Sequence, residues 1–221
     1  MFLVTGDLHG DAKDLQKRRF GRIGADDFIV ICGDFGLVWD GSKEEQKELE
    51  RLGRSRHGVL FLDGAHENFD LLARYPVTDW NGGKAQIISG NLVHLMRGQV
   101  YTITGKRVFT FGGGESEDRE MRTPHQSWWP QEMPDEQEMR AGVQALVEAQ
   151  WQVDYIFTYE APTAFHKYIE SGSDELNALN VYLECIREKC RYQKWVFGCY
   201  HKDRSITPDF DAVFGGVVRL Q

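Results

Sequence analysis

The first third of the chain repeats one pattern three times: a short apolar run, a loop that contains glycine, and a polar segment with helical spacing of its apolar residues. Such short apolar runs are typical of strands that are buried on both faces. We expect strands at 2–5, 28–32 and 59–62, and helices at 11–20, at 43–54 and around Phe69, Leu71 and Leu72. Three such units in succession predict right-handed crossovers and a largely parallel sheet.

After residue 98 the pattern changes to that of a β-hairpin, with strands at 99–104 and 107–111. The later elements are expected as a helix at 134–150, a strand at 153–157, a helix at 174–190, a strand at 194–197 and closing strands around Ile206 and over 210–220. A long loop before residue 134 contains Trp128 and Trp129. Loops of this length are typically functional; the alternative is that the tryptophans only cover the core.

Composition argues against several classes of protein. The 221 residues, 41% of them hydrophobic, contain no internal repeat or linker, so we expect one domain over residues 1–221. A net charge of −8 disfavours a membrane-surface binder and also disfavours long nucleic acids as substrate. No apolar run approaches the ~18 residues of a membrane span, and no signal-peptide pattern is present. The cysteines lack CxxC spacing, which indicates a cytoplasmic protein without disulfides.

Candidate chemistry gathers at the ends of the expected strands. Asp7 and His9 follow the first strand, Asp34 follows the second, and His66 follows the third. The carboxyl ends of parallel strands meet at one edge of a sheet, so we expect these side chains to lie close together. Carboxylate and imidazole groups suit a metal that accepts oxygen and nitrogen ligands. The alternative for the first loop is a plain turn in which Asp7 caps a helix and His9 is solvated.

Together these loops resemble the calcineurin-like metallophosphoesterase superfamily, whose motifs are D-x-H, G-D, G-N-H-[E/D], a lone histidine after a later strand, and G-H-x-H. The corresponding segments here are 7–9, 33–34, 64–67, 158–162 and 198–201, in the same order and with similar spacing. The stretch from Gly112 to Glu132 resembles a small bacterial or phage-type branch. The resemblance implies a four-layer α/β fold, in which two mixed β-sheets pack as a sandwich flanked by helices, with two metal ions at the sheet edge.

The resemblance also implies roles for individual residues. Asp7, His9, Asp34 and His201 match the ligands of one ion, for which we expect manganese, iron or zinc, with Asp34 as the carboxylate that bridges to a second ion. The metal would activate water for attack on phosphorus. His66 matches the histidine that assists the leaving oxygen as a general acid.

The second metal site departs from the family pattern. Ala65, Tyr159 and Cys199 stand where the family has an asparagine and two histidines. Tyr159 and Cys199 can ligate a metal only after losing a proton. Three outcomes stay open: an empty second site, a site re-tooled for zinc or iron through Asp34, Tyr159 and Cys199, or a protein that has lost catalysis. We favour the interpretation that Tyr159 and Cys199 are neutral fillers of a vacated pocket.

The function we expect is metal-dependent hydrolysis of a phosphomonoester or phosphodiester with one intact metal site. The alternative is an inactive relative that binds a metal or phosphate ligand as an interaction module, and a weaker third idea is thiol chemistry at Cys199. Neither the identity of the phosphate-ester substrate nor an oligomeric state is indicated.

Several other polar residues receive weaker interpretations. Arg119 and Arg122 either contact a phosphate or form surface salt bridges, and Asp63 is interpreted as a turn-former. Glu160 lies near the expected metal zone, but no pattern assigns it a role. Four further histidines are interpreted as surface or packing residues: His57, His94, His125 and His166.

Overall fold

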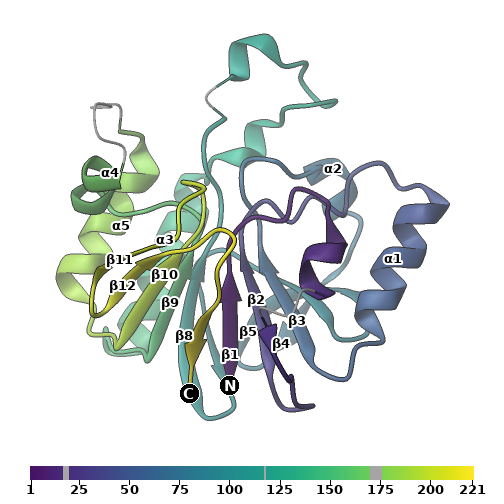
Figure 1. Ribbon diagram of the computed structural model, residues 1–221. Coiled ribbons are helices and arrows are strands. Elements are labelled where there is room, and N and C mark those ends of the chain that lie inside the picture. Colours follow the sequence, from purple (N-terminus) through teal and green to yellow (C-terminus); the bar gives the residue numbers. More distant parts are fainter. Residues whose placement is uncertain (17–19, 117, 170–175) are drawn as a thin grey trace.

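The computed structural model describes residues 1–16, 20–116, 118–169 and 176–221. Two mixed β-sheets pack against each other, and helices cover the outer face of each sheet (Figure 1). This arrangement confirms the four-layer α/β fold class that the resemblance implies.

Within the described residues, the first sheet has seven strands. In spatial order they are β13 (Val218–Leu220), β1 (Phe2–Thr5), β2 (Phe28–Cys32), β3 (Gly58–Leu62), β6 (Leu92–Leu95), β5 (Gly83–Ser89) and β4 (Val77–Trp80). The four strands β1, β2, β3 and β6 run parallel, with Phe2 opposite Phe28 and Phe28 opposite Gly58. The outer strands β13, β5 and β4 pair antiparallel.

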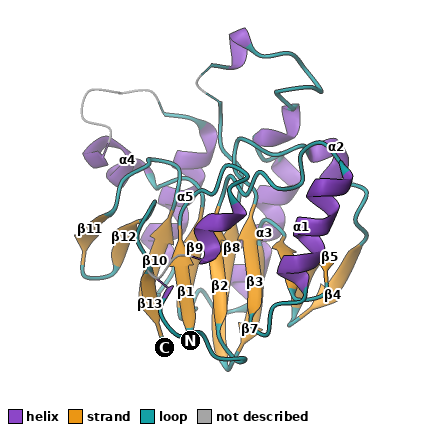
Figure 2. Cartoon of the chain, turned by 45° about the vertical axis from the view of Figure 1, so that its right-hand side comes forward, coloured by secondary structure: helices purple, strands orange, loops and turns teal. Residues whose placement is uncertain are grey.

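The second sheet has six strands within the same described ranges. In spatial order they are β11 (Arg204–Thr207), β12 (Phe210–Ala212), β10 (Lys194–Phe197), β9 (Tyr155–Thr158), β8 (Lys106–Phe111) and β7 (Gln99–Ile103). The inner four are parallel, and β7 and β8 form the predicted antiparallel hairpin. Figure 2 shows the strands of both sheets rising toward the same set of loops.

Side-chain alternation along the strands explains the layers. Because successive side chains point to opposite faces of a strand, Val30 and Cys32 of β2 pack between the sheets, whereas Ile29 and Ile31 face outward. Each central strand is therefore apolar on both faces, as the continuous runs in the sequence require.

Five α-helices are described: α1 (Lys43–Gly53), α2 (Phe69–Leu72), α3 (Glu136–Glu148), α4 (Thr163–Ile169) and α5 (Ala178–Lys189). Helix α1 begins at the N-cap Ser42 and packs Leu49 and Leu52 on the first sheet. Helix α3 begins with a capping box at Asp135. Residues of α3 and α5 cover the outer face of the second sheet. Among the described residues, no helix combines the length and the hydrophobicity that a bilayer crossing requires.

Three parts of the chain differ from the expected elements. Residues 77–95 form β4, β5 and β6, which the pattern did not predict because Gln86 and His94 are buried as a hydrogen-bonded polar pair and interrupt the apolar alternation. The helix expected at 11–20 is a 3-10 helix over Ala12–Gln16, and residues 17–19 of that prediction lie outside the described residues. The helix expected from residue 174 begins at Ala178, and its predicted first residues 174 and 175 are also outside them.

Candidate metal centre

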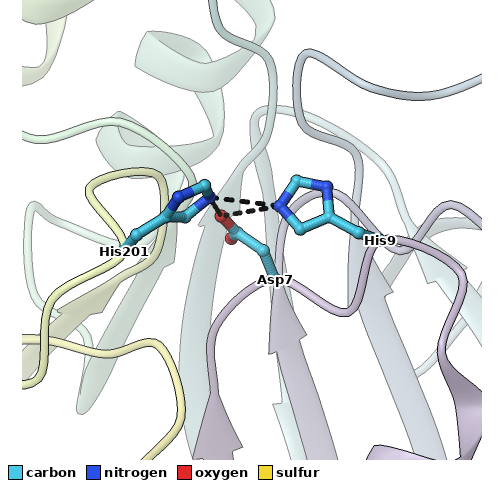
Figure 3. Close-up of side chains that lie close together, drawn as sticks. All are labelled: Asp7, His9 and His201. Carbon is cyan, nitrogen blue, oxygen red and sulfur yellow. Dashed lines mark hydrogen bonds and ion pairs between the residues drawn. The ribbon is translucent and has the colours of Figure 1, made fainter.

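The side chains of Asp7, His9 and His201 converge at the carboxyl ends of the strands (Figure 3). Asp7 and His9 lie on the loop after β1, and His201 lies on the loop after β10. The Nε2 atoms of His9 and His201 are 3.1 Å apart. Oδ2 of Asp7 lies 3.1 Å from Nε2 of His201 and 3.9 Å from Nε2 of His9.

This group fits a divalent metal ion. Oδ2 of Asp7 is buried and makes no hydrogen bond within the described part of the chain, despite the two nearby imidazoles. Two imidazole nitrogens and this carboxylate oxygen all lie within 4.8 Å of one another. One cation placed among them would satisfy the unpartnered oxygen, and manganese, iron and zinc all accept such mixed nitrogen and oxygen ligands.

Asp34 belongs to a second group that overlaps the first through His9. His9 faces Asp7 with Nε2 and lies 3.8 Å from Oδ2 of Asp34 with Nδ1. Oδ2 of Asp34 is 2.7 Å from Nδ1 of His66, and Oδ1 accepts a hydrogen bond from the backbone N–H of His66. The four expected ligands are therefore neighbours. Asp34 is hydrogen-bonded to His66, whereas the other three converge on one point.

Burial and charge set the proton affinities of these groups. Burial raises the pKa of Asp7 to about 6. The carboxylate of Asp7, whose Oδ2 lies 3.1 Å from Nε2, raises the pKa of His201. Burial would also raise the pKa of Asp34, but its contacts with His66 and His9 outweigh burial and lower it. The hydrogen bond to Asp34 in turn raises the pKa of His66. Asp34 is thus held ionised beside a histidine that readily carries a proton.

The backbone around the centre is strained. His9, Asp34, Cys199 and His201 all have positive φ, at 46°, 41°, 66° and 48°. Non-glycine residues seldom adopt this left-handed region, and such residues cluster at functional sites. Three of the four are expected metal ligands, so the fold holds these side chains in place at a cost in backbone energy.

Tyr159 fills the space beside Asp34. Its hydroxyl donates a hydrogen bond to Oδ2 of Asp34 over 3.0 Å. A Cβ added at Gly33 or Gly114 would lie 2.0 or 2.5 Å from the tyrosine ring, so the ring is held closely between two glycines. Side chains larger than hydrogen at these two positions would exclude the ring.

Neither Tyr159 nor Cys199 is poised to bind a cation. Burial raises the pKa of Tyr159 well above its usual value, with further contributions from Cys199 and Asp34. Burial and the neighbouring Glu160 likewise raise the pKa of Cys199. Ala65 has no donor atom. A cation that binds here would therefore have to displace a proton from both the phenol and the thiol.

The loop between β8 and α3 lies over the carboxyl ends of the strands and rises at the top of Figure 1. Its Arg122 contacts Nε2 of His66 through Nη2 and bonds Asp118 at 2.5 Å and the carbonyl of Ser127 at 3.0 Å. The two tryptophans of this loop differ. Trp129 is buried and donates to Asp70, whereas the ring of Trp128 lies beneath the guanidinium of Arg119.

A cavity of about 420 Å³ lies beside the centre. Its lining residues are Asp34, Ala65, His66, Glu115, Ser116, Asp118, Arg122, Tyr159, Glu160, His166, Cys199, Tyr200 and His201. The pattern missed His166, which bonds the hydroxyl of Tyr200 at 2.9 Å. That hydroxyl donates to Glu160. In the sequence, Tyr200 and Glu160 could be recognised only by their positions after expected strands. His166 lies in helix α4, which the pattern did not predict.

Asp63 has a different environment from the turn that the sequence indicated. It is buried and forms an ion pair with Arg97 and a 3.1 Å contact with His94. These charges lower the pKa of Asp63 to about 2, against the effect of burial. The three residues line a separate cavity of about 700 Å³ that shares no lining residue with the cavity beside the metal group. Asp63 therefore stabilises the fold beneath the site.

A two-sheet sandwich with aspartate and histidine side chains gathered at its strand ends is typical of metal-dependent hydrolases. The family model described as calcineurin-like phosphoesterase matches residues 1–198, and the chain belongs to this family. Hydrolysis of a phosphate ester is the class of activity that membership gives it.

Two further comparisons complete the picture. The crystal structure of phosphopantetheinyl hydrolase (PptH) from Mycobacterium tuberculosis is similar over 96% of this chain and 89% of that chain, with 15% identity and a TM-score of 0.49. No curated protein sequence matches the chain.

Proposed function

We propose that the chain hydrolyses a phosphomonoester or phosphodiester with one divalent metal ion, bound by Asp7, His9 and His201 with Asp34 adjoining. The observation that carries this proposal is the convergence of two imidazole nitrogens on a buried carboxylate oxygen that makes no hydrogen bond within the described chain. Manganese, iron and zinc are the candidates, since all accept this ligand set.

When bound, the metal supplies an activated water and polarises a phosphoryl oxygen. The chain's own residues perform the remaining tasks. Asp34 accepts a hydrogen bond from Nδ1 of His66 and so fixes the orientation of the ring. Nε2 of His66 then lies on the cavity side, where it donates a proton to the departing oxygen. The hydrogen bond to Asp34 raises the pKa of His66, which favours the protonated ring that this step requires.

The chemistry we propose uses a single metal. Tyr159 supplies a hydrogen bond to Asp34 where the family has a second cation, and Ala65 and Cys199 complete an uncharged filling. The substrate is a phosphate ester that reaches the 420 Å³ cavity, and we expect the protein to act in the cytoplasm.

The decisive experiment compares His66→Ala with wild-type protein on esters of different leaving groups. Metal content, measured by elemental analysis on protein purified without chelator, should stay near one ion per chain. Hydrolysis of an alkyl phosphate should fall by roughly 10²–10⁴-fold. Hydrolysis of p-nitrophenyl phosphate should fall less, because p-nitrophenolate departs without a proton. An equal, small effect on both esters would contradict the role of His66.

The second candidate is a binding module without turnover, and the observation that favours it is the filling of the second cation site by Tyr159. A metal-loaded sample that binds inorganic phosphate but hydrolyses no ester, with manganese, iron or zinc supplied, would favour the module. His9→Ala provides the matched control, because it should remove the metal and any activity together.

A further inference from the structure

The charges at the centre leave a phosphate group short of a positive partner. The two carboxylates of Asp7 and Asp34 balance the formal charge of one divalent ion, so that ion can polarise a phosphoryl oxygen but adds no excess positive charge. Among the described residues that line the cavity, Arg122 alone is an arginine or lysine. A phosphoryl group needs positive charge on its oxygens as it reacts, and arginine often supplies that charge.

We propose that Arg122 is the phosphate-binding cation of this site and provides the positive charge that a second metal ion would otherwise contribute. The inference rests on the proposed function and deepens it. It makes Arg122 a residue that touches the substrate, in a loop where the sequence left phosphate binding and a surface salt bridge as equal alternatives.

Two nitrogens of Arg122 bond oxygen atoms of the loop, and the third contacts only His66 among the described residues. Nε bonds the carboxylate of Asp118, and Nη1 bonds the carbonyl oxygen of Ser127. Nη2 faces Nε2 of His66, which can accept a hydrogen bond from Nη2 only while that nitrogen carries no proton. A phosphoryl oxygen accepts a charged hydrogen bond more strongly than a neutral imidazole does. Because the guanidinium is planar and rigid, the two anchors also fix the position of Nη2, and a phosphoryl oxygen that displaces Nε2 of His66 would accept a hydrogen bond from it there.

The position of Nη2 also fits the reaction. The group that it touches, His66, is the one proposed to protonate the departing oxygen. An oxygen bound by Nη2 would therefore lie beside the bond that breaks. The side chain of Arg122 is 16% exposed, so its charge is only partly screened by solvent.

Arg119 provides a matched control in the same loop. Its guanidinium lies 4.3 Å over the ring of Trp128 and 3.9 Å from the carboxylate of Glu115. Its side chain is 55% exposed, and it does not line the cavity. Loss of Arg119 removes the same formal charge from the loop without removing a lining residue, and it reaches the cavity only through the 3.9 Å contact with Glu115.

The test measures binding of inorganic phosphate by calorimetry to manganese-loaded wild-type protein and to the variants Arg122→Ala, Arg122→Lys and Arg119→Ala. We expect Arg122→Ala to weaken phosphate binding by about 10- to 100-fold, as for the loss of one charged hydrogen bond. Arg122→Lys should recover part of the affinity, because lysine keeps the charge but lacks the fork. Arg119→Ala should bind phosphate as wild type does. Metal content should be unchanged in all three, and Arg122→Ala should stay folded but melt at a lower temperature, because it loses the contacts with Asp118 and Ser127.

Equal phosphate affinity in wild type and Arg122→Ala would overturn the inference, as would an equal loss in Arg119→Ala or no binding to wild type. None of these readings requires turnover. A protein that binds phosphate through Arg122 yet hydrolyses no ester would therefore retain the inference while the proposed hydrolysis failed. With an active sample, Arg122→Ala should also lower kcat/KM by on the order of 10²–10³-fold.

Discussion

The hydroxyl of Tyr159 donates a hydrogen bond to Oδ2 of Asp34 across 3.0 Å, and the same oxygen lies 2.7 Å from Nδ1 of His66. One carboxylate oxygen thus serves a phenol and an imidazole together. Asp34 therefore contacts both the phenol of Tyr159 and the imidazole of His66, and we expect these contacts to determine how many cations can bind beside it.

The variant Tyr159→Phe tests whether the phenol is a hydrogen-bond donor or a metal ligand. The ring stays in place, so we expect metal content to remain near one ion per chain. Loss of one hydrogen bond to a charged group should lower the free energy of unfolding by about 1–3 kcal/mol. Elemental analysis and a denaturant titration check both values. A drop in metal content would instead identify a phenolate ligand.

Restoring the family residues should create a second metal site. The triple variant Ala65→Asn, Tyr159→His and Cys199→His replaces an alanine, a protonated phenol and a protonated thiol with neutral oxygen and nitrogen donors around Asp34. We expect two ions per chain by elemental analysis, against one in wild type. The single variant Cys199→His serves as control and should stay at one, because Tyr159 still fills the space. A triple variant that binds one ion would contradict this account of the filling.

Metal affinity should weaken as the pH falls. Binding requires an ionised Asp7, whose pKa burial raises to about 6, and a neutral His201, whose pKa Asp7 raises above its usual value. Below pH 6 the metal must displace protons from both groups. We therefore expect the apparent affinity to fall by about tenfold or more per pH unit there. Titrations with manganese at pH 8, 7, 6 and 5 check this, and an affinity that is constant from pH 7 to 5 would contradict it.

The buried pair of Asp63 and Arg97 should make stability depend on acid. The folded-state pKa of Asp63, about 2, lies below its usual 3.8, so the stabilisation is fully present above pH 4 and is lost as the pH falls toward 2. The shift corresponds to roughly 2 kcal/mol. Asp63→Asn should destabilise the protein by about 3–5 kcal/mol at neutral pH, because Arg97 is left buried and unpaired.

Denaturant midpoints between pH 7 and pH 3 measure this effect. Asp79→Asn is the control, since Asp79 pairs with Lys84 but is 88% exposed. The control should change little, as exposed ion pairs contribute little to stability. Equal losses of stability in Asp63→Asn and Asp79→Asn would contradict a larger contribution from the buried pair.

The sequence predicted those elements in which the buried positions are mainly apolar. Strands such as β2 and β3 are buried on both faces and carry continuous apolar runs, and the hairpin of β7 and β8 alternates around a glycine turn. Strands β5 and β6 escaped prediction because Gln86 and His94 satisfy each other inside the protein. No local pattern reveals that kind of pairing.

The site was predictable only in part, for a similar reason. The order of the strands placed Asp7 and His9 at one sheet edge, whereas His201 follows a strand of the other sheet and was assigned only through the family resemblance. The environments of Arg122 and Asp63 depend instead on tertiary partners. Arg122 meets His66 across 56 residues, and Asp63 meets Arg97 across 34. A residue's spacing to its neighbours in sequence carries no information about such partners.

The convergence of His9 and His201 has a consequence for the synthesis of the protein on the ribosome. The two rings are separated by 192 residues along the chain. A nascent chain on the ribosome presents His9 early, but it cannot assemble the metal centre until the segment around residue 201 has emerged and β10 has joined its sheet. Uptake of the proposed ion would therefore come late in biosynthesis, and the bound ion would close a very long loop of the folded chain.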